Sequence, residues 1–256
     1  MTKIGFIGIG MFADYTIKGM RNGGVNDVFY LSPRGKANAE SLASSHNCEV
    51  LSSNQAVIDA CDVIIMCVRP ESYDEMAAEI NVPAGKVIIS AMAGITVEKL
   101  QSTLNVNDNI FRTLPVCCSE AGEGLVPVYP AGNDTVNNIL KPLGKVLELA
   151  QEDEFNGATI ASCINGSFYY LYDTMIEWFV KQGYDEEMAK AFVFENLSGT
   201  IAYAKLQSDK TLKQVGDSIA TEGTYTLEGY KAMKDAGGLD GWNVGLDAIK
   251  KRFDDN

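Results

Sequence analysis

The sequence predicts an α/β fold followed by an all-helical region, and three observations support this prediction. Short apolar runs alternate with helical patterns from the N-terminus to about residue 155. A glycine-rich turn joins the first apolar run to the first helical pattern. Beyond residue 155 the strand patterns cease, and only long helical patterns remain. Because alternating strands and helices are typical of a parallel sheet covered on both faces, we expect a parallel-sheet domain over residues 1–155 and an all-helical domain over 156–256.

The expected elements of the first domain follow in chain order from apolar runs and helical periodicity. The run DVIIMCV at residues 62–68 is the clearest strand, because a continuous apolar run suits a strand buried on both faces. The expected strands are 3–8, 27–32, 50–51, 62–68, 87–91, 109–114 and 124–128. The expected helices between them are 11–22, 36–45, 55–60 and 96–104.

The second domain is expected to contain helices alone. They cover residues 158–182, 185–207, 212–219, 225–236 and 241–253. The helix at 158–182 is apolar and aromatic over most of its surface, and such a helix is buried on nearly all sides. It is either the central core helix of a monomer or a surface covered by a second subunit, and the sequence leaves both interpretations open.

Composition excludes several classes of function. Lys and Arg number 21 and Asp and Glu 34, so the net charge of −13 disfavours nucleic acid and anionic membranes as partners. No apolar stretch is long enough to suggest a membrane span. The six cysteines form no CxxC pair, and a strand begins at once at the N-terminus, so we expect reduced thiols, no signal peptide and a cytoplasmic location. No metal site is expected, since His46 is the sole histidine.

The sharpest motif is Gly8-Ile9-Gly10-Met11-Phe12-Ala13, between the first strand and the first helix. In this pattern the first glycine permits a tight turn, and the second lets the backbone approach a pyrophosphate. The third position, here Ala13, must be small so that helix and strand pack closely. The helix N-terminus then offers N–H groups to the phosphates. The motif predicts a Rossmann dinucleotide-binding domain.

The end of the second expected strand distinguishes NADP from NAD. NAD sites usually carry an acidic residue about 20 residues past the glycines, which binds the ribose 2′-hydroxyl. This chain instead has Ser32-Pro33-Arg34-Gly35-Lys36, with no acid. Ser32 can donate to a 2′-phosphate and Arg34 can pair with it, so NADP(H) is favoured over NAD. A solvated basic turn without a ligand is the alternative interpretation.

The shortage of acid–base residues points to the bond that is reduced. Reduction of a ketone usually needs a general acid for the new alkoxide, and the one histidine, His46, lies in a segment expected to be a surface loop. An imine nitrogen is basic, so an imine can enter as the iminium and accept hydride without a strong enzyme acid. A hydroxyl that orients the nitrogen suffices.

These motifs together resemble the pyrroline-5-carboxylate reductase family over nearly the whole chain. IGFIGIGMFA matches the family's first strand and turn, and DVIIMCVRP matches a later strand, with Arg69 in place of the usual lysine. The further matches are AMAGIT at 91–96, RTLP at 112–115, Asn165-Gly166-Ser167 with Ile176-Glu177, and TEGTYTLEG at 221–229. The resemblance implies NADPH-dependent reduction of a cyclic imine, 1-pyrroline-5-carboxylate, to proline. It also implies a helix-swapped homodimer or higher homo-oligomer.

The resemblance also implies a set of site residues. Thr226 matches the threonine that hydrogen-bonds the ring nitrogen of the substrate, and Thr221, Gly223 and Thr224 belong to the loop that receives its carboxylate. The implied cofactor-binding residues are Gly8, Ile9, Gly10, Met11, Phe12, Ala13, Ser32, Arg34, Asn54, Val68, Pro70, Ala93 and Gly94.

The substrate half departs from the family pattern. Val116-Cys117-Cys118 replaces the family's NTP, SGSGPAY becomes Asn165-Gly166-Ser167-Phe168-Tyr169, and SPGGTT keeps one of its two glycines. These departures leave open a non-catalytic NADP-binding paralogue or sensor. Separately, Thr224 and Thr226 can be interpreted as residues that merely cap the helix that follows. A β-hydroxyacid dehydrogenase-like oxidoreductase is the third possibility, although no lysine lies between Asn165 and Ile176, where that family needs one.

Overall fold

The computed structural model describes residues 2–254 and divides the chain into two compact units. The first unit ends at Ser162 and the second begins at Cys163. The last two residues of the expected helical domain, 255 and 256, lie outside the described residues. The boundary between functional domains that we expect after residue 155 stays a prediction.

An eight-stranded sheet forms the centre of the first unit, in the order β3-β2-β1-β4-β5-β6-β7-β8. The strands are β1 Ile4–Ile7, β2 Phe29–Leu31, β3 Cys48–Val50, β4 Val63–Met66, β5 Val87–Ser90, β6 Ile110–Thr113, β7 Leu125–Tyr129 and β8 Lys145–Glu148. Strand β1 pairs with both β2 and β4, so the strand order reverses beside it. In open α/β sheets this reversal opens a ligand-binding crevice at the carboxyl ends of the strands.

One pairing corrects the expectation of a parallel sheet. Strand β7 runs antiparallel to β6, whereas every other neighbouring pair of the sheet is parallel. The connection between β6 and β7 contains a single 3₁₀ turn, η2 (Cys117–Ala121), and no full crossover helix. A parallel pairing needs a longer crossover, whereas antiparallel neighbours do not.

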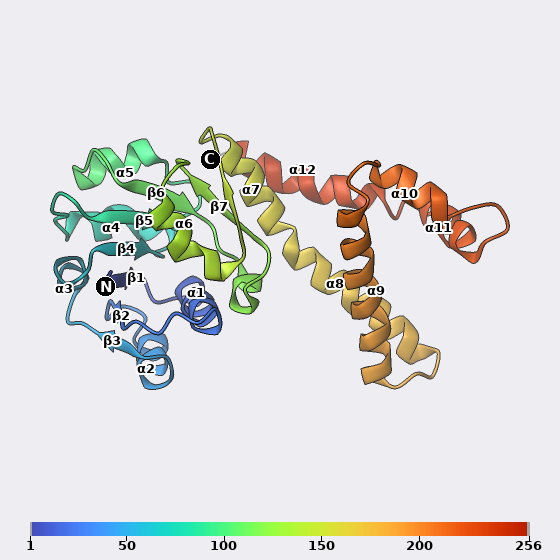
Figure 1. Ribbon diagram of the computed structural model, residues 1–256, viewed down its shortest axis with the longest axis horizontal. Helices are drawn as coiled ribbons and strands as arrows, with labels where there is room; N and C mark the ends of the chain where they lie inside the picture. The colour runs from blue at the N-terminus through green and yellow to red at the C-terminus, as the bar shows by residue number, and fades with distance from the viewer. Residues whose placement is uncertain (1, 255–256) are drawn as a thin grey trace. The chain divides into compact units, whose positions relative to one another are not determined.

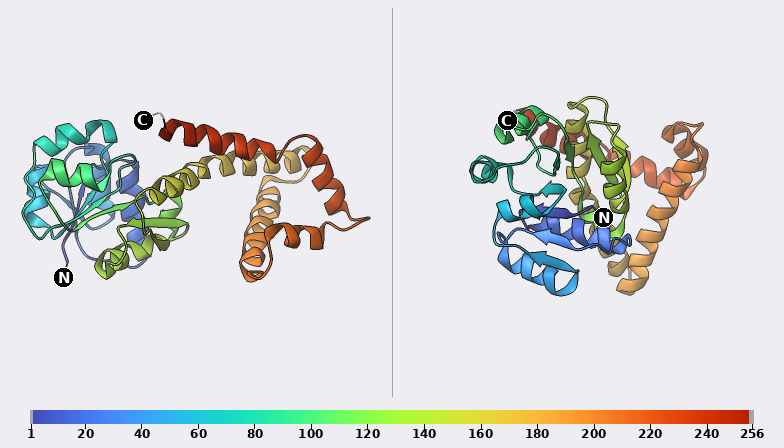
Figure 2. Two further views of the ribbon diagram at one scale, coloured as in Figure 1. Left: turned by 90° about the horizontal axis from the view of Figure 1, so that it is seen from above. Right: turned by 60° about the vertical axis from the view of Figure 1, so that its left-hand side comes forward.

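Helices cover both faces of the sheet, as Figures 1 and 2 show. On one face lie α1 (Met11–Asn22), α2 (Lys36–Ser45) and α6 (Asp134–Leu140), which pack into one apolar cluster with the strands. On the other face lie α3 (Asn54–Ala60), α4 (Tyr73–Ala78) and α5 (Val97–Leu104), which pack into a second cluster. Phe6 and Ile7, adjacent on β1, belong to opposite clusters. This two-sided burial explains why the inner strands read as continuous apolar runs.

A third apolar cluster anchors the start of α7 (Glu154–Cys163) in the first unit. It consists of Leu114, Leu149, Phe155 and Ala158. The Phe155 side chain is fully buried, so the first turn of α7 is fixed against the residues that follow β6 and β8.

The second unit is helical. Its helices are α8 (Asn165–Lys181), α9 (Glu186–Leu206), α10 (Leu212–Ile219), α11 (Tyr225–Asp235) and α12 (Asp240–Asp254). Among the described residues no helix is long and apolar enough to cross a membrane.

The single helix expected at 158–182 is wrong in one respect, because it is divided into α7 and α8 at Ile164. Asn165 and Gly166 are weak helix formers, and a tighter bond from Ser167 N–H to the Ile164 carbonyl (2.9 Å) marks the break. Helix α8 has no buried residue in the single chain. It is therefore not a buried core helix. Phe168 and Phe179 pack on aromatic rings of neighbouring helices, whereas Tyr170 and Trp178 stay exposed.

Candidate cofactor and substrate site

The turn after β1 is built around Gly8, whose φ is +89°. A Cβ atom at this position would lie 2.8 Å from the Val68 backbone nitrogen, so only glycine allows β1 to approach the end of β4 so closely. The Gly8 N–H donates to Ser32 Oγ at 3.0 Å, which fixes the turn to the end of β2. Three strand ends therefore meet at this glycine.

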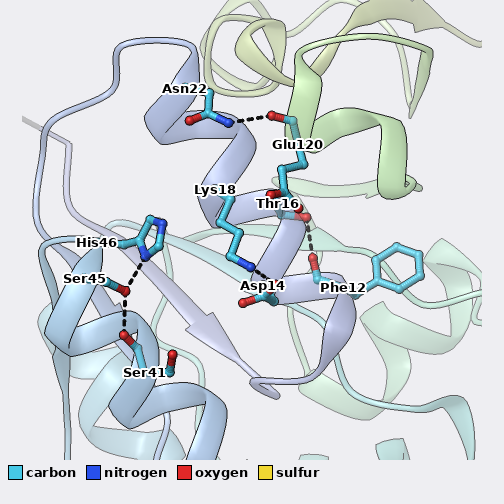
Figure 3. Close-up of polar contacts among 9 residues, drawn as sticks. All are labelled: Phe12, Asp14, Thr16, Lys18, Asn22, Ser41, Ser45, His46 and Glu120. Atoms are coloured by element: carbon cyan, nitrogen blue, oxygen red, sulfur yellow. Dashed lines mark hydrogen bonds and ion pairs between the residues drawn. The ribbon is translucent and has the colours of Figure 1, made fainter. Parts of the chain in front are cut away.

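Helix α1 begins just beyond this turn without a side-chain cap. Its N-cap, Gly10, is extended, and a Cβ added there would meet no atom within 4 Å. The first N–H groups of the helix therefore receive no side-chain cap, and a ligand can approach the backbone at Gly10, as an anion site at a helix N-terminus requires. Asp14, the acidic residue of this turn, is paired with Lys18 at 2.7 Å (Figure 3), which offsets its charge near the site.

A cavity of about 300 Å³ lies at these strand ends, at the point where the strand order reverses. Its lining comes from the turns after β1, β2 and β4, which are distant in sequence. The lining residues are Gly8, Ile9, Gly10, Arg34, Gly35, Cys67, Val68, Arg69 and Ser72. The sequence-based interpretation includes Gly8, Ile9, Gly10, Arg34 and Val68, and omits the other four. Two of the omitted residues, Cys67 and Arg69, lie inside the motif DVIIMCVRP, which the sequence analysis had already identified.

The charge of this cavity opposes that of the whole chain. Arg34 and Arg69 both line it, and no carboxylate does. Neither arginine forms an ion pair with a carboxylate among residues 2–254. A guanidinium presents a planar set of donors that matches phosphate oxygens. In a protein of net charge −13, this local pair of cations makes the cavity suitable for an anionic ligand.

Ser32 has a different position from the one expected. Its side chain is fully buried, and its Oγ accepts the Gly8 N–H instead of facing the cavity. Ser32 therefore holds the glycine turn, and a donation from it to a phosphate is not seen in this geometry. The Ile9 N–H donates to the Arg34 carbonyl at 3.4 Å, so the backbone of Arg34 lies next to the glycine turn.

The remaining expected cofactor residues are not part of the cavity lining. Met11 is exposed at the start of α1, whereas Phe12 is half-buried and Ala13 is buried against the sheet. Asn54 begins α3 and Pro70 begins the 3₁₀ turn η1 (Pro70–Ser72). Ala93 and Gly94 form the turn after β5, where Gly94 has φ +75°. Their contacts with a cofactor stay predictions.

The one thiol in the cavity lining is uncharged near neutral pH. Burial raises the pKa of Cys67 to about 12, because the thiolate would lose its hydration. Burial also raises the pKa of Tyr15, whose hydroxyl lies 3.4 Å from the Pro115 carbonyl. The arginines are therefore the charged groups that the cavity offers to a ligand at neutral pH.

The expected substrate residues lie at the turn between α10 and α11, in the second unit. Thr224 caps α11, since its Oγ1 accepts the Leu227 N–H at 3.2 Å and donates to the Thr221 carbonyl at 2.7 Å. Gly223 supplies the positive φ (+79°) of this turn. Thr226 is exposed in the first turn of α11, and its hydroxyl makes no hydrogen bond within the described part of the chain. Thr224 is thus committed to the helix, while Thr226 is available to a ligand.

His46 lies away from the cavity. It follows α2 at the amino end of β3, with Nδ1 2.7 Å from Ser45 Oγ (Figure 3), whereas the cavity lies at the carboxyl ends of the strands. It is not placed to act as an acid at the cavity. No group of three or more possible metal-ligating side chains occurs within residues 2–254.

Fold and cavity define the class first: a Rossmann-type dinucleotide-binding unit followed by a helical unit. The family model described as NADP oxidoreductase coenzyme F420-dependent matches residues 3–94, and the model for pyrroline-5-carboxylate reductase dimerisation matches residues 152–254. Together with the curated relatives below, these matches support the pyrroline-5-carboxylate reductase family for this chain.

Individual relatives are distant but match nearly end to end. Pyrroline-5-carboxylate reductase 2 of Bacillus subtilis (strain 168) is 24% identical over 250 residues, which cover 92% of this chain and 88% of the relative. The crystal structure of the Plasmodium falciparum pyrroline carboxylate reductase with NADP bound has a TM-score of 0.85 and 23% identity, covering 98% and 97% of the two chains. The Streptococcus pyogenes 1-pyrroline-5-carboxylate reductase also gives 0.85, at 21% identity, covering 100% and 99%. These structural likenesses show the fold.

Proposed function

We propose that this protein is an NADPH-dependent oxidoreductase that reduces the C=N bond of a cyclic imine, 1-pyrroline-5-carboxylate, to give proline. The observation that carries the proposal is the cavity at the strand ends, which combines a glycine turn, an uncapped helix N-terminus and two arginines without a carboxylate. The names of the relatives, one of them with NADP bound, support the same cofactor and substrate.

The residues of the first unit bind and orient the cofactor. Gly10 leaves room for the pyrophosphate to approach the backbone, and the N-terminal N–H groups of α1 donate to it. The Arg34 guanidinium pairs with the 2′-phosphate that distinguishes NADPH from NADH. Ser32 acts indirectly, by holding Gly8 in place.

The substrate step needs little acid–base chemistry from the protein. When bound, NADPH supplies a hydride from its nicotinamide ring to the imine carbon. The imine nitrogen enters protonated, so that transfer yields the neutral secondary amine, which is protonated in water. The Thr226 hydroxyl hydrogen-bonds this nitrogen, and the turn formed by Thr221 and Gly223 receives the carboxylate. This role suits Thr226, whose hydroxyl is exposed and has no partner within the described chain.

The active form is a homodimer or a higher homo-oligomer. The second unit matches a family model that is described by dimerisation, and α8 buries no residue within one chain. A second copy is the natural cover for such an aromatic surface. A cytoplasmic location stays a prediction from the cysteine pattern.

The first test is NADPH oxidation, followed by absorbance, with pyrroline-5-carboxylate as substrate and with NADH in parallel. We expect turnover that favours NADPH. Binding of NADPH without turnover of any cyclic imine would instead indicate a non-catalytic NADP-binding paralogue. Oxidation of 3-hydroxy acids would indicate a β-hydroxyacid dehydrogenase-like enzyme.

The preference for NADPH over NADH can be tested with the variant Arg34→Ala. Removal of the guanidinium should raise KM for NADPH by about 10- to 100-fold, because a charge-assisted pair with phosphate contributes roughly 1.5–3 kcal/mol. KM for NADH should barely change, since NADH has no 2′-phosphate. Lys145→Ala is the matched control, since it removes one positive charge from strand β8, outside the cavity. Equal losses for both cofactors would contradict the assigned role.

A further inference from the structure

An ion pair in the first unit, between Arg112 and Glu152, has no role yet assigned. The Arg112 side chain, on β6, is 3% exposed, and its Nη1 donates to Glu152 Oε1 at 2.7 Å. The Arg112 guanidinium also lies over the Phe155 ring, 4.1 Å from its centroid. Phe155 is fully buried in the first turn of α7. The pair thus joins β6 to the start of α7 within the first unit.

The same carboxylate oxygen holds a third element. Glu152 Oε1 accepts the N–H of Val97, the first residue of α5, at 2.8 Å. This N–H is one of those that a helix N-terminus leaves without an internal partner, and a negative charge is favourable there. Glu152 therefore fixes the N-terminus of α5 from 55 residues away in the sequence.

The ion pair between Arg112 and Glu152 is not an efficient way to stabilise the fold. Arg112 Nε is buried without a hydrogen-bond partner among the described residues. Burial lowers the pKa of Arg112, although the bond to Glu152 opposes that effect. A buried, incompletely satisfied ion pair often stabilises a fold less than apolar residues of the same size. We therefore look for its role in the positions of the elements that it joins, which are β6, the start of α7 and the N-terminus of α5.

The segment that it holds is connected to the cavity lining through the end of strand β4. The turn at residues 91–96 runs from the end of β5 into α5, and it begins where the Ala91 N–H donates to the Met66 carbonyl at 2.9 Å. Met66 ends β4, and the next residue, Cys67, lines the cavity. Arg34 lines the cavity on the side of β2, where the 2′-phosphate of the adenosine half is expected to bind. A dinucleotide that lies across the strand reversal would then extend its nicotinamide half toward β4 and β5.

We propose that Glu152, held by Arg112, is a positioning residue that fixes the turn at 91–96 against the nicotinamide half of the cofactor. This inference rests on the proposed function, because it requires a nicotinamide dinucleotide in the cavity. Glu152 contacts no reacting atom and acts through the N-terminus of α5.

The test is Glu152→Gln in the full-length protein, with two ligands titrated by calorimetry. NADPH reports on both halves of the cofactor site, whereas 2′,5′-ADP reports on the adenosine half alone. We expect the Kd of NADPH to rise about 5- to 10-fold and kcat to fall about 10-fold or more, because small displacements of a reacting group are costly. The Kd of 2′,5′-ADP should stay within about twofold of the wild-type value. The enhancement of NADPH fluorescence on binding should also decrease.

Two further variants separate positioning from stability. Arg112→Met/Glu152→Met removes both charges, so thermal stability should recover relative to Glu152→Gln, while NADPH binding stays weakened. Asp74→Asn is the matched control, because it breaks the exposed ion pair between Asp74 and Lys99 of α5 (2.7 Å) and leaves the α5 N-terminus intact.

The outcomes are distinct. Parallel losses for NADPH and 2′,5′-ADP, or no change in either, would overturn the positioning role and leave the proposed function standing. A wild-type protein that binds no NADPH would overturn both.

Discussion

At the scale of single residues, Gly8 and Gly10 serve different purposes. Gly8 is required by the fold, because its φ is +89° and a side chain there would collide with Val68. Gly10 has an ordinary extended backbone and open space around it, so the fold itself does not require glycine. What requires glycine at position 10 is the proposed approach of the pyrophosphate.

Gly10→Ala should therefore separate binding from stability. The free energy of unfolding should change by less than about 1 kcal/mol, the usual range for such an N-cap replacement. The NADPH affinity should fall at least about 10-fold, since the new methyl group takes the space that the pyrophosphate needs. Chemical denaturation and calorimetric titration measure the two quantities.

Gly8→Ala is the comparison variant, and it should lose both quantities. A non-glycine residue in a strained conformation costs on the order of 1–3 kcal/mol, before the overlap with Val68 is counted. If Gly10→Ala binds NADPH normally, the pyrophosphate does not lie at the start of α1.

At the scale of secondary-structure elements, helix bounds could be predicted from the sequence where the apolar periodicity is strong. The expected helices at 11–22, 36–45 and 212–219 have the bounds that the structure gives, because each carries a regular apolar stripe or clear end signals. The sequence missed α4, α6 and β8, which are short. Strand β8, KVLE, is mostly exposed and is held by its pairing with β7, a contact that local pattern does not reveal.

The part of the candidate site that rests on local motifs could be predicted from the sequence, and the part that rests on tertiary contacts could not. The glycine turn and Arg34 follow from a local motif with a known spacing. Arg69 and Ser72 line the cavity because β4 lies beside β1, which is a tertiary fact. The link between Arg112 and Glu152 spans 40 residues and depends on the packing of α7, so no local pattern could predict it.

The start of α11 provides a test at the element scale. Thr224→Ala should lower the free energy of unfolding by about 1 kcal/mol, because it removes the N-cap acceptor of the Leu227 N–H. Thr226→Val leaves this cap intact, so it should keep the wild-type stability and lose turnover through the missing hydroxyl. Urea unfolding and kcat, measured on both variants, distinguish the two threonines. Equal losses of stability would mean that Thr226 is also structural.

At the scale of the whole molecule, the two units differ in how completely they bury their apolar residues. The sheet of the first unit is closed on both faces by helices. The second unit leaves large apolar side chains exposed in the single chain, among them Tyr170, Trp178, Phe194, Leu206, Leu212 and Val244. Apolar exposure of this extent marks an interaction surface, and the dimerisation description of the matching family model indicates a second copy as its cover.

Tyr170→Asp tests this assignment, because Tyr170 is 76% exposed in the single chain and lies on α8. An unpaired carboxylate buried in an apolar interface costs several kcal/mol, so light scattering should show the variant as a monomer where the wild type is a dimer. The first unit should still bind NADPH, while turnover is lost with the assembly. Leu147→Asp is the matched control, since it places the same charge at an exposed apolar position of β8 in the first unit. A wild-type chain that is itself monomeric, or a Tyr170→Asp variant that stays dimeric, would place the interface elsewhere.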